Sequence, residues 1–183
     1  GTFEKGLKMV PFLEDMLKEY GIYLDTHRVL VFYYKIACLY FGSGNNEKAI
    51  DYLNRIINQK ADLRTDLQCY ARLLHLIAHS ELGNFDLLEY LIKSVYRYMA
   101  RMENLSKVEE EMFAFLRRSF HVGAHALTPE FEKLLVKLKK YEGNPLESRA
   151  FAYLDVISWL ESKINKVNVQ DVIREKYARR KNK

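Results

Sequence analysis

Residues 29–61 decide the fold of this chain, and they read VLVFYYKIACLYFGSGNNEKAIDYLNRIINQKA. The first half is apolar on most sides of a helix that we place over 26–42, a pattern typical of a helix packed on more than one face. The apolar run is too long for an ordinary strand, and it contains no turn signal. After the turn GSGNN, the apolar residues Ala49, Leu53 and Ile56 recur at helical spacing. The segment therefore predicts a helical hairpin.

The same periodicity continues along the whole chain, which holds only 8 Gly and 3 Pro in 183 residues. So few breaking residues favour long helices over a many-turned β fold. Local signals set the expected helix starts: Pro11 in a first turn, an N-cap at Asp25 or Thr26 and at Asn45 or Asn46, the capping box of Ser106 and Glu109, and Thr128 before Pro129. We predict helices over 3–20, 26–42, from 46, 62–82, 85–102, 106–120, 128–141, 147–163, and from 169 into a frayed end.

The net charge of +5 is concentrated at the C-terminal end. Residues 174–183 contain six Lys or Arg and one Glu, so the rest of the chain sums to zero. A neutral body disfavours a dedicated nucleic-acid-binding fold, which carries a basic face. In the tail, Arg179, Arg180, Lys181 and Lys183 are candidates for contact with phosphates or with an acidic partner. The alternative is a helix end whose cations match the helix dipole.

No apolar run approaches the length of a membrane span, and no signal peptide is recognisable. The two cysteines, Cys38 and Cys69, lie in apolar helical patterns and do not form a disulfide framework. We therefore expect a cytoplasmic protein without membrane contact. Because the chain starts with Gly1, we also expect it to be the C-terminal part of a longer protein, whose N-terminal part is a candidate partner.

An internal repeat appears at a shift of 39 residues. The pair Gly44-Asn45 corresponds to Gly83-Asn84, and the apolar positions that follow also correspond, namely Ala49 with Leu88, Leu53 with Ile92, and Ile56 with Val95. Self-similarity at such a period indicates a helical solenoid. One hairpin cannot bury its own apolar face, so stacked neighbours must cover it.

The first copy resembles the tetratricopeptide repeat family at Tyr33, Ile36, Ala37, Tyr40, Gly44, Ala49, Leu53 and Ile56. The second copy departs from that pattern in its first helix, where Arg72, His75, Leu76 and His79 stand. The resemblance covers roughly residues 29–102. The spacing of 39 exceeds the usual period of about 34, which implies longer helices.

The resemblance implies an all-α fold, with antiparallel hairpins stacked as a right-handed superhelix. We expect one domain over 1–183, with repeat units 29–61 and 68–102 and degenerate helical pairs 106–142 and 147–180. The family's concave groove would be lined here by Tyr34, Lys35, Cys38, Phe41, Tyr70, Leu73, Ile77 and Ser80. An apolar groove of this kind suits an amphipathic helix. The alternative, that the chain's own helices close the groove, stays open.

Two histidine pairs have a spacing of four residues, which allows two imidazoles to reach one metal ion: His75 with His79, and His121 with His125. The zincin motif needs a Glu directly after the first His, and no Glu stands there in either pair. Phosphate-binding loops and a nucleophile elbow are also missing from the sequence. We therefore predict a non-catalytic protein-binding or scaffold module without cofactor or metal. The alternative is a regulatory nucleic-acid-associated protein that uses the basic tail.

Overall fold

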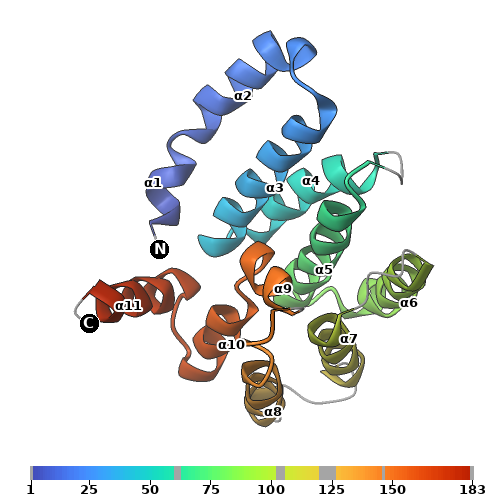
Figure 1. Ribbon diagram of the computed structural model, residues 1–183, viewed down its shortest axis with the longest axis vertical. Coiled ribbons are helices and arrows are strands. Elements are labelled where there is room, and N and C mark those ends of the chain that lie inside the picture. Colours follow the sequence, from blue (N-terminus) through green and yellow to red (C-terminus); the bar gives the residue numbers. More distant parts are fainter. Residues whose placement is uncertain (1, 60–62, 102–105, 120–126, 146, 182–183) are drawn as a thin grey trace. The chain divides into compact units, whose positions relative to one another are not determined.

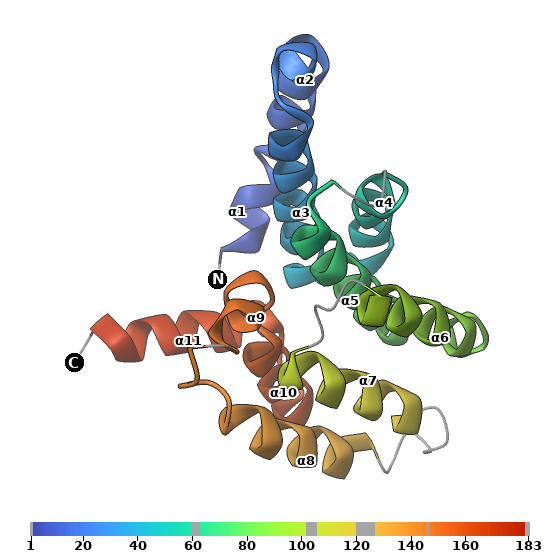
Figure 2. The same cartoon turned by 45° about the vertical axis from the view of Figure 1, so that its right-hand side comes forward.

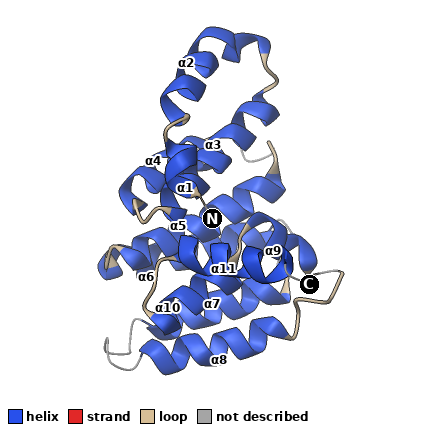
Figure 3. Cartoon of the chain, turned by 90° about the vertical axis from the view of Figure 1, so that its left-hand side faces the viewer, coloured by secondary structure: helices blue, strands red, loops and turns tan. Residues whose placement is uncertain are grey.

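A computed structural model describes the chain except for residues 1, 60–62, 102–105, 120–126, 146 and 182–183 (Figure 1). Every regular element among the described residues is a helix, as the colouring of Figure 3 shows. This confirms the predicted all-α class. No helix in the described part of the chain is both long enough and apolar enough to cross a membrane.

The chain divides into two compact units, residues 1–82 and 83–183. Sequence analysis predicts one domain, and the boundary between the units lies inside the predicted repeat unit 68–102. It coincides with the turn at Gly83, whose φ of +72° lies in the left-handed region that glycine adopts without strain. We describe each unit by itself.

The first unit contains α1 (Phe3–Leu7), α2 (Val10–Tyr20), the 3₁₀ helix η1 (Gly21–Tyr23), α3 (Thr26–Gly42), α4 (Asn46–Ile57) and α5 (Thr65–Glu81). The predicted helix over 3–20 is thus two helices that meet at Lys8 and Met9. Pro11 explains the break, because it has no N–H to donate and its ring would clash with the carbonyl of Leu7 in a continuous helix. Pro11 lies in the first turn of α2, as predicted.

The hairpin of α3 and α4 forms as the sequence predicts. The Asp25 carboxylate accepts a hydrogen bond from the backbone N–H of His27 at 3.1 Å and caps α3. The Asn45 side chain accepts one from the N–H of Lys48 at 3.1 Å and caps α4. Between the two helices, Gly44 has a φ of +87°, which allows the chain to reverse within a few residues.

The core of the first unit lies between α3, α4 and α5, which pack against one another. Leu30 and Ala37 of α3, Leu53 and Ile56 of α4, and Leu74 of α5 are almost fully buried. These are positions of the helical stripes read from the sequence. Apolar burial along the predicted stripes therefore holds the first unit together.

The second unit contains α6 (Phe85–Arg101), α7 (Lys107–Ser119), α8 (Leu127–Lys139), α9 (Ser148–Tyr153), α10 (Val156–Asn165) and α11 (Val169–Lys181). The capping box before α7 is confirmed: the N–H of Ser106 donates to the Glu109 carboxylate at 2.7 Å, and the N–H of Glu109 donates to the Ser106 hydroxyl at 3.3 Å. Helix α8 begins one residue before the predicted start at Thr128.

The predicted helix over 147–163 is wrong, because α9 and α10 are separate. Leu154 between them is extended, with φ −136° and ψ 109°. The carboxylate of Asp155 then accepts a hydrogen bond from the N–H of Ser158 at 2.9 Å and caps α10. An Asp three residues before a Ser is a start signal that the sequence analysis overlooked.

In the second unit, α8 packs against both α7 and α10 (Figure 2). An aromatic cluster joins these three helices: the Trp159 ring meets Phe131 and Phe115 edge to face, at centroid distances of 5.7 Å and 6.4 Å. The Glu147 carboxylate accepts hydrogen bonds of 3.2 Å from the N–H groups of Lys107 and Val108. It thereby satisfies the N-terminus of α7 from another part of the chain.

We predict that Leu53→Ala lowers the free energy of unfolding by about 2–5 kcal/mol, because it leaves a cavity in the core of the first unit. Ile57→Ala on the same helix is the matched control, since Ile57 is only half-buried and its site can fill with solvent. Urea unfolding followed by far-ultraviolet circular dichroism measures both. Equal losses for the two variants would contradict the assignment of the core.

Candidate functional site

The predicted groove residues differ widely in exposure. Lys35 is exposed, whereas Cys38, Phe41 and Ser80 are half-buried and the other four are buried: Tyr34, Tyr70, Leu73 and Ile77. Desolvation raises the pKa of the Cys38 thiol to about 12, so this thiol stays protonated and unreactive at neutral pH. A partner could reach the four buried residues only by displacing elements of the chain. The groove therefore stays a prediction, and the accessible surface must be sought elsewhere.

His75 and His79 on α5 point toward each other. Their Nε2 atoms are 3.3 Å apart, and both side chains are buried. Desolvation, together with the neighbouring His79, lowers the pKa of His75 to about 4, and desolvation also lowers the pKa of His79. Both rings are therefore neutral at pH 7 and share a hydrogen bond. The other predicted pair, His121 and His125, lies outside the described residues.

No group of three or more metal-ligating side chains of His, Cys, Asp or Glu occurs in the part of the chain that the structure describes. Structural zinc sites have four ligands. Among the described residues, the pair on α5 consists of two buried imidazoles within hydrogen-bonding distance of each other, without a third ligand.

The basic tail is helical, because α11 continues through Arg179 and Arg180 to Lys181 instead of fraying. Arg179 forms an ion pair with Glu175, whereas Arg180 and Lys181 are exposed. Lys183 lies outside the described residues. The tail thus offers three exposed cations in its last described turn, of which Arg179 is paired with Glu175, and all three match the negative end of the helix dipole.

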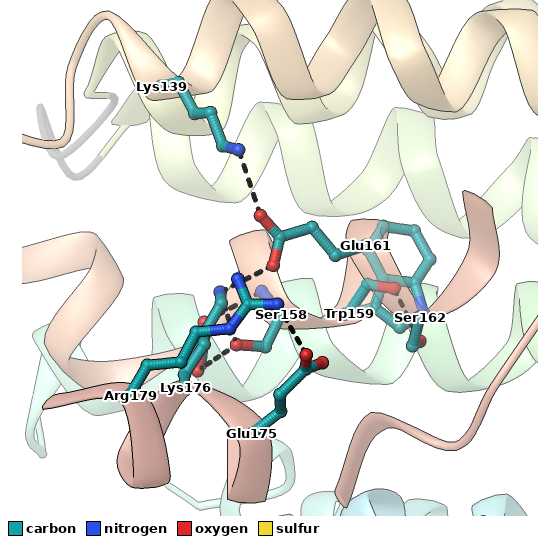
Figure 4. A network of polar contacts seen from close by, with 9 residues as sticks. Lys139, Ser158, Trp159, Glu161, Ser162, Glu175, Lys176 and Arg179 are labelled. Atoms are coloured by element: carbon teal, nitrogen blue, oxygen red, sulfur yellow. Dashed lines mark hydrogen bonds and ion pairs between the residues drawn. The ribbon is translucent and has the colours of Figure 1, made fainter. Parts of the chain in front are cut away.

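A polar network attaches α11 to the rest of the second unit (Figure 4). The Glu161 carboxylate on α10 accepts contacts from Lys139 of α8 at 3.0 Å and from Lys176 of α11 at 2.8 Å. Lys176 also donates to the Ser158 hydroxyl at 2.9 Å. Desolvation alone would raise the pKa of Glu161, but the hydrogen bonds and charges of the two lysines lower it. The network is therefore a set of satisfied ion pairs that positions α11.

A cleft of about 510 Å³ adjoins this network between α8, α10 and α11. Its charged lining consists of three basic and three acidic side chains, which are Lys139, Lys176, Arg179, Glu161, Asp171 and Glu175. Because these charges cancel, the cleft has no net field that would attract an anion or a cation. We do not assign a ligand to it.

Several exposed apolar side chains of the first unit lie on α2 and directly beside it. Met9, Phe12, Met16 and Tyr20 recur at spacings of three and four residues, so they share one face of the helix. Met9, Phe12 and Tyr20 are 57%, 60% and 48% exposed. Directly after them, Ile22 and Tyr23 of η1 are 81% and 80% exposed. We call these six residues the α2 surface.

The opposite side of α2 is attached to α4. The Glu14 carboxylate accepts a hydrogen bond from the Tyr52 hydroxyl and pairs with Arg55 at 3.6 Å. At 3.6 residues per turn, Glu14 lies nearly opposite the stripe that contains Phe12 and Met16. In α2, whose residues are all described, Val10 alone is buried. The helix, drawn in blue in Figure 1, is therefore held to α4 by Glu14, while Phe12 and Tyr20 face solvent.

Sequence analysis did not find this surface. The apolar residues of 3–20 predict a helix because they fall at helical spacing, but that spacing is the same for a helix that packs inward and for one that awaits a partner. The signal that could have found it is the breadth of the apolar arc. Leu13 and Leu17 form a second, half-buried stripe on α2. Packing within the unit therefore does not need the stripe of Met9, Phe12, Met16 and Tyr20.

We predict that acid destabilises the protein through the α5 histidine pair. Between about pH 6.5, the pKa of an unfolded histidine, and about pH 4, the pKa of folded His75, the unfolded chain binds more protons than the folded chain. Lowering the pH from about 7 to about 5 should therefore reduce the free energy of unfolding by about 2 kcal/mol through His75. Urea unfolding at the two pH values measures this loss.

The variant His75→Gln/His79→Gln should show a correspondingly smaller loss on acidification, whereas His27→Gln, which changes a histidine outside the pair, should behave as the parent protein. If the double variant lost as much stability on acidification as the parent protein, the assigned burial of the pair would be wrong.

Comparisons with known proteins found no relative. No protein-family model, no curated protein and no solved structure matches the chain. The function is therefore argued from the geometry of the described residues.

Proposed function

We propose that this chain is a non-catalytic protein-binding module and that the α2 surface contacts its partner. The observation that supports this is the exposure of five large apolar side chains close together on α2, η1 and the residue before α2, with the half-buried Met16 among them. Single exposed apolar residues are normal in folded proteins, but a contiguous apolar patch marks an interaction site. Aromatic residues and Met, which make up most of the α2 surface, are enriched in protein interfaces.

The energetics support the same proposal. A helix as short as α2 is marginal in water by itself, so contacts with other elements must maintain it. Covering Phe12, Tyr20 and Tyr23 removes apolar area that is worth about 25 cal/mol per Å². A large aromatic side chain has about 150–250 Å² of surface. These three are between 48% and 80% exposed, so covering about 100 Å² of each contributes on the order of 2 kcal/mol. A few such anchors account for most of the affinity in a typical interface.

The geometry of the stripe favours a helical partner. Met9 and Tyr20 are three helical turns apart, which is about 16 Å along the axis. A straight ridge of this kind packs into the groove of another helix. We also propose that the first unit belongs to a tetratricopeptide-like array, which the succession of packed helices α3, α4 and α5 supports. The contact would then be made by the helix before the α3–α4 hairpin and not by the predicted groove.

Nucleic-acid binding through α11 is the second candidate, supported by the exposed Arg180 and Lys181. Few phosphate contacts give weak binding, with a correspondingly small salt dependence. Lys176 and Arg179 of the same helix are already in ion pairs with carboxylates. We therefore rank this function below protein binding.

We predict that a photo-crosslinking amino acid in place of Phe12 gives discrete protein adducts in cells, because this position lies at the centre of the proposed contact. The matched control is the same amino acid in place of Tyr90, an aromatic residue of α6 that is 67% exposed and lies outside the α2 surface. Adducts are separated by electrophoresis and identified by mass spectrometry.

Adducts formed from position 12 should disappear when Tyr23→Asp is added, because a buried charge opposes docking. The proposal fails if position 12 yields no more adduct than position 90.

A further inference from the structure

We propose that the partner of the α2 surface is a second copy of this chain, and that the two α2 helices pack antiparallel about a two-fold axis. This inference rests on the proposed protein-binding function and specifies its partner. It follows from the pattern of α2, whose apolar and charged positions are complementary to those of a second α2. A surface that binds an unrelated protein does not need this property.

The apolar residues match their own copies in the antiparallel direction. With the two-fold axis near residue 14, Met9 of one copy lies opposite Tyr20 of the second copy. Phe12 likewise lies opposite Met16 of the second copy. Each of these contacts occurs twice, as an isologous interface requires. Large side chains thus meet flexible Met side chains, which adapt their shape and make favourable contacts with aromatic rings.

The charged residues beside the stripe match in the same register. Lys8 and Glu19 are both exposed, and they are separated by three helical turns. The backbone of Lys8 and Met9 is in the α region, so the helical spacing extends to Lys8. Both side chains therefore lie along one edge of the stripe, at opposite ends of it.

A two-fold axis places Lys8 of each copy beside Glu19 of the second copy. A parallel pairing would instead place the two Lys8 residues on opposite edges of the interface, and likewise the two Glu19 residues, so neither end would gain an attractive contact. The remaining charged residues that are exposed on α2, Asp15 and Lys18, form their own pair at 3.6 Å on the outer side of the helix. The charge pattern therefore selects the antiparallel arrangement.

The available area agrees with a dimer of modest stability. A large side chain has about 200 Å² of surface. Multiplied by the exposed fractions of its residues, this gives the α2 surface on the order of 600 Å² of exposed area in each copy. A two-fold pair that also covers Ile22 and Tyr23 would thus bury at most roughly 1,200 Å², which is the lower end of the range for specific interfaces. We therefore expect a dimer whose population depends on concentration.

Sedimentation velocity on the whole chain, over about a hundredfold range of concentration at low salt, tests the proposal. The parent protein should pass from monomer to dimer, and Phe12→Asp should remain monomeric. Lys8→Glu and Glu19→Lys should each weaken the dimer about tenfold, because two ion pairs become two repulsions. The double variant Lys8→Glu/Glu19→Lys should restore the affinity. Lys18→Glu is the matched control, because Lys18 lies on α2 away from the proposed interface. It should have little effect.

Each other outcome overturns the inference. A dimer that persists in Phe12→Asp places the interface elsewhere, and a double variant that stays weak excludes the antiparallel register. A protein that is monomeric throughout, yet gives adducts with a different protein from position 12, would refute the second copy and leave the protein-binding function intact. A monomer without adducts would refute both.

Discussion

The contact of Glu14 with Tyr52 and Arg55 determines how α2 is presented. Desolvation, reinforced by the hydrogen bond to Glu14, raises the pKa of Tyr52, so the phenol remains a hydrogen-bond donor at physiological pH. Arg55 in turn lies over the Tyr52 ring, 4.4 Å from its centroid. This arrangement holds the polar side of α2 against α4. The apolar side of α2 is left in solvent as a consequence, and the proposed function depends on that orientation.

Each unit contains a helix that cannot bury all of its faces. The two units attach this helix in different ways. In the second unit the end helix α11 is attached by ion pairs to Glu161 and by the buried Val172. In the first unit α2, which follows the short helix α1, is attached by Glu14, and its large side chains Phe12 and Tyr20 stay exposed. An exposed apolar face costs free energy that a partner recovers on binding. This asymmetry is why we place the contact on α2 and not on α11.

The sequence predicted those parts of the fold that local signals determine. Caps at Asp25, Asn45 and Ser106 and the turn at Gly44 were predicted correctly because each depends on a few neighbouring residues. The break at Leu154 was overlooked because Asp155 caps a helix inside a continuous apolar pattern. The exposure of the α2 surface could not be predicted, because periodicity shows which residues share a face and not what that face contacts. The groove residues came from a family resemblance, which does not show whether the chain itself buries residues such as Ile77 and Leu73.

Hydroxyl-radical footprinting tests the central claim most directly, because Met, Tyr and Phe side chains are oxidised in proportion to their exposure. Two samples are compared: the protein in the assembly isolated from cells, and the purified chain at high dilution. The account predicts that Met9, Met16 and Tyr23 are protected in the assembly, while Tyr90 is oxidised equally in both samples. Equal oxidation of the α2 surface in both samples would contradict its role as a contact surface.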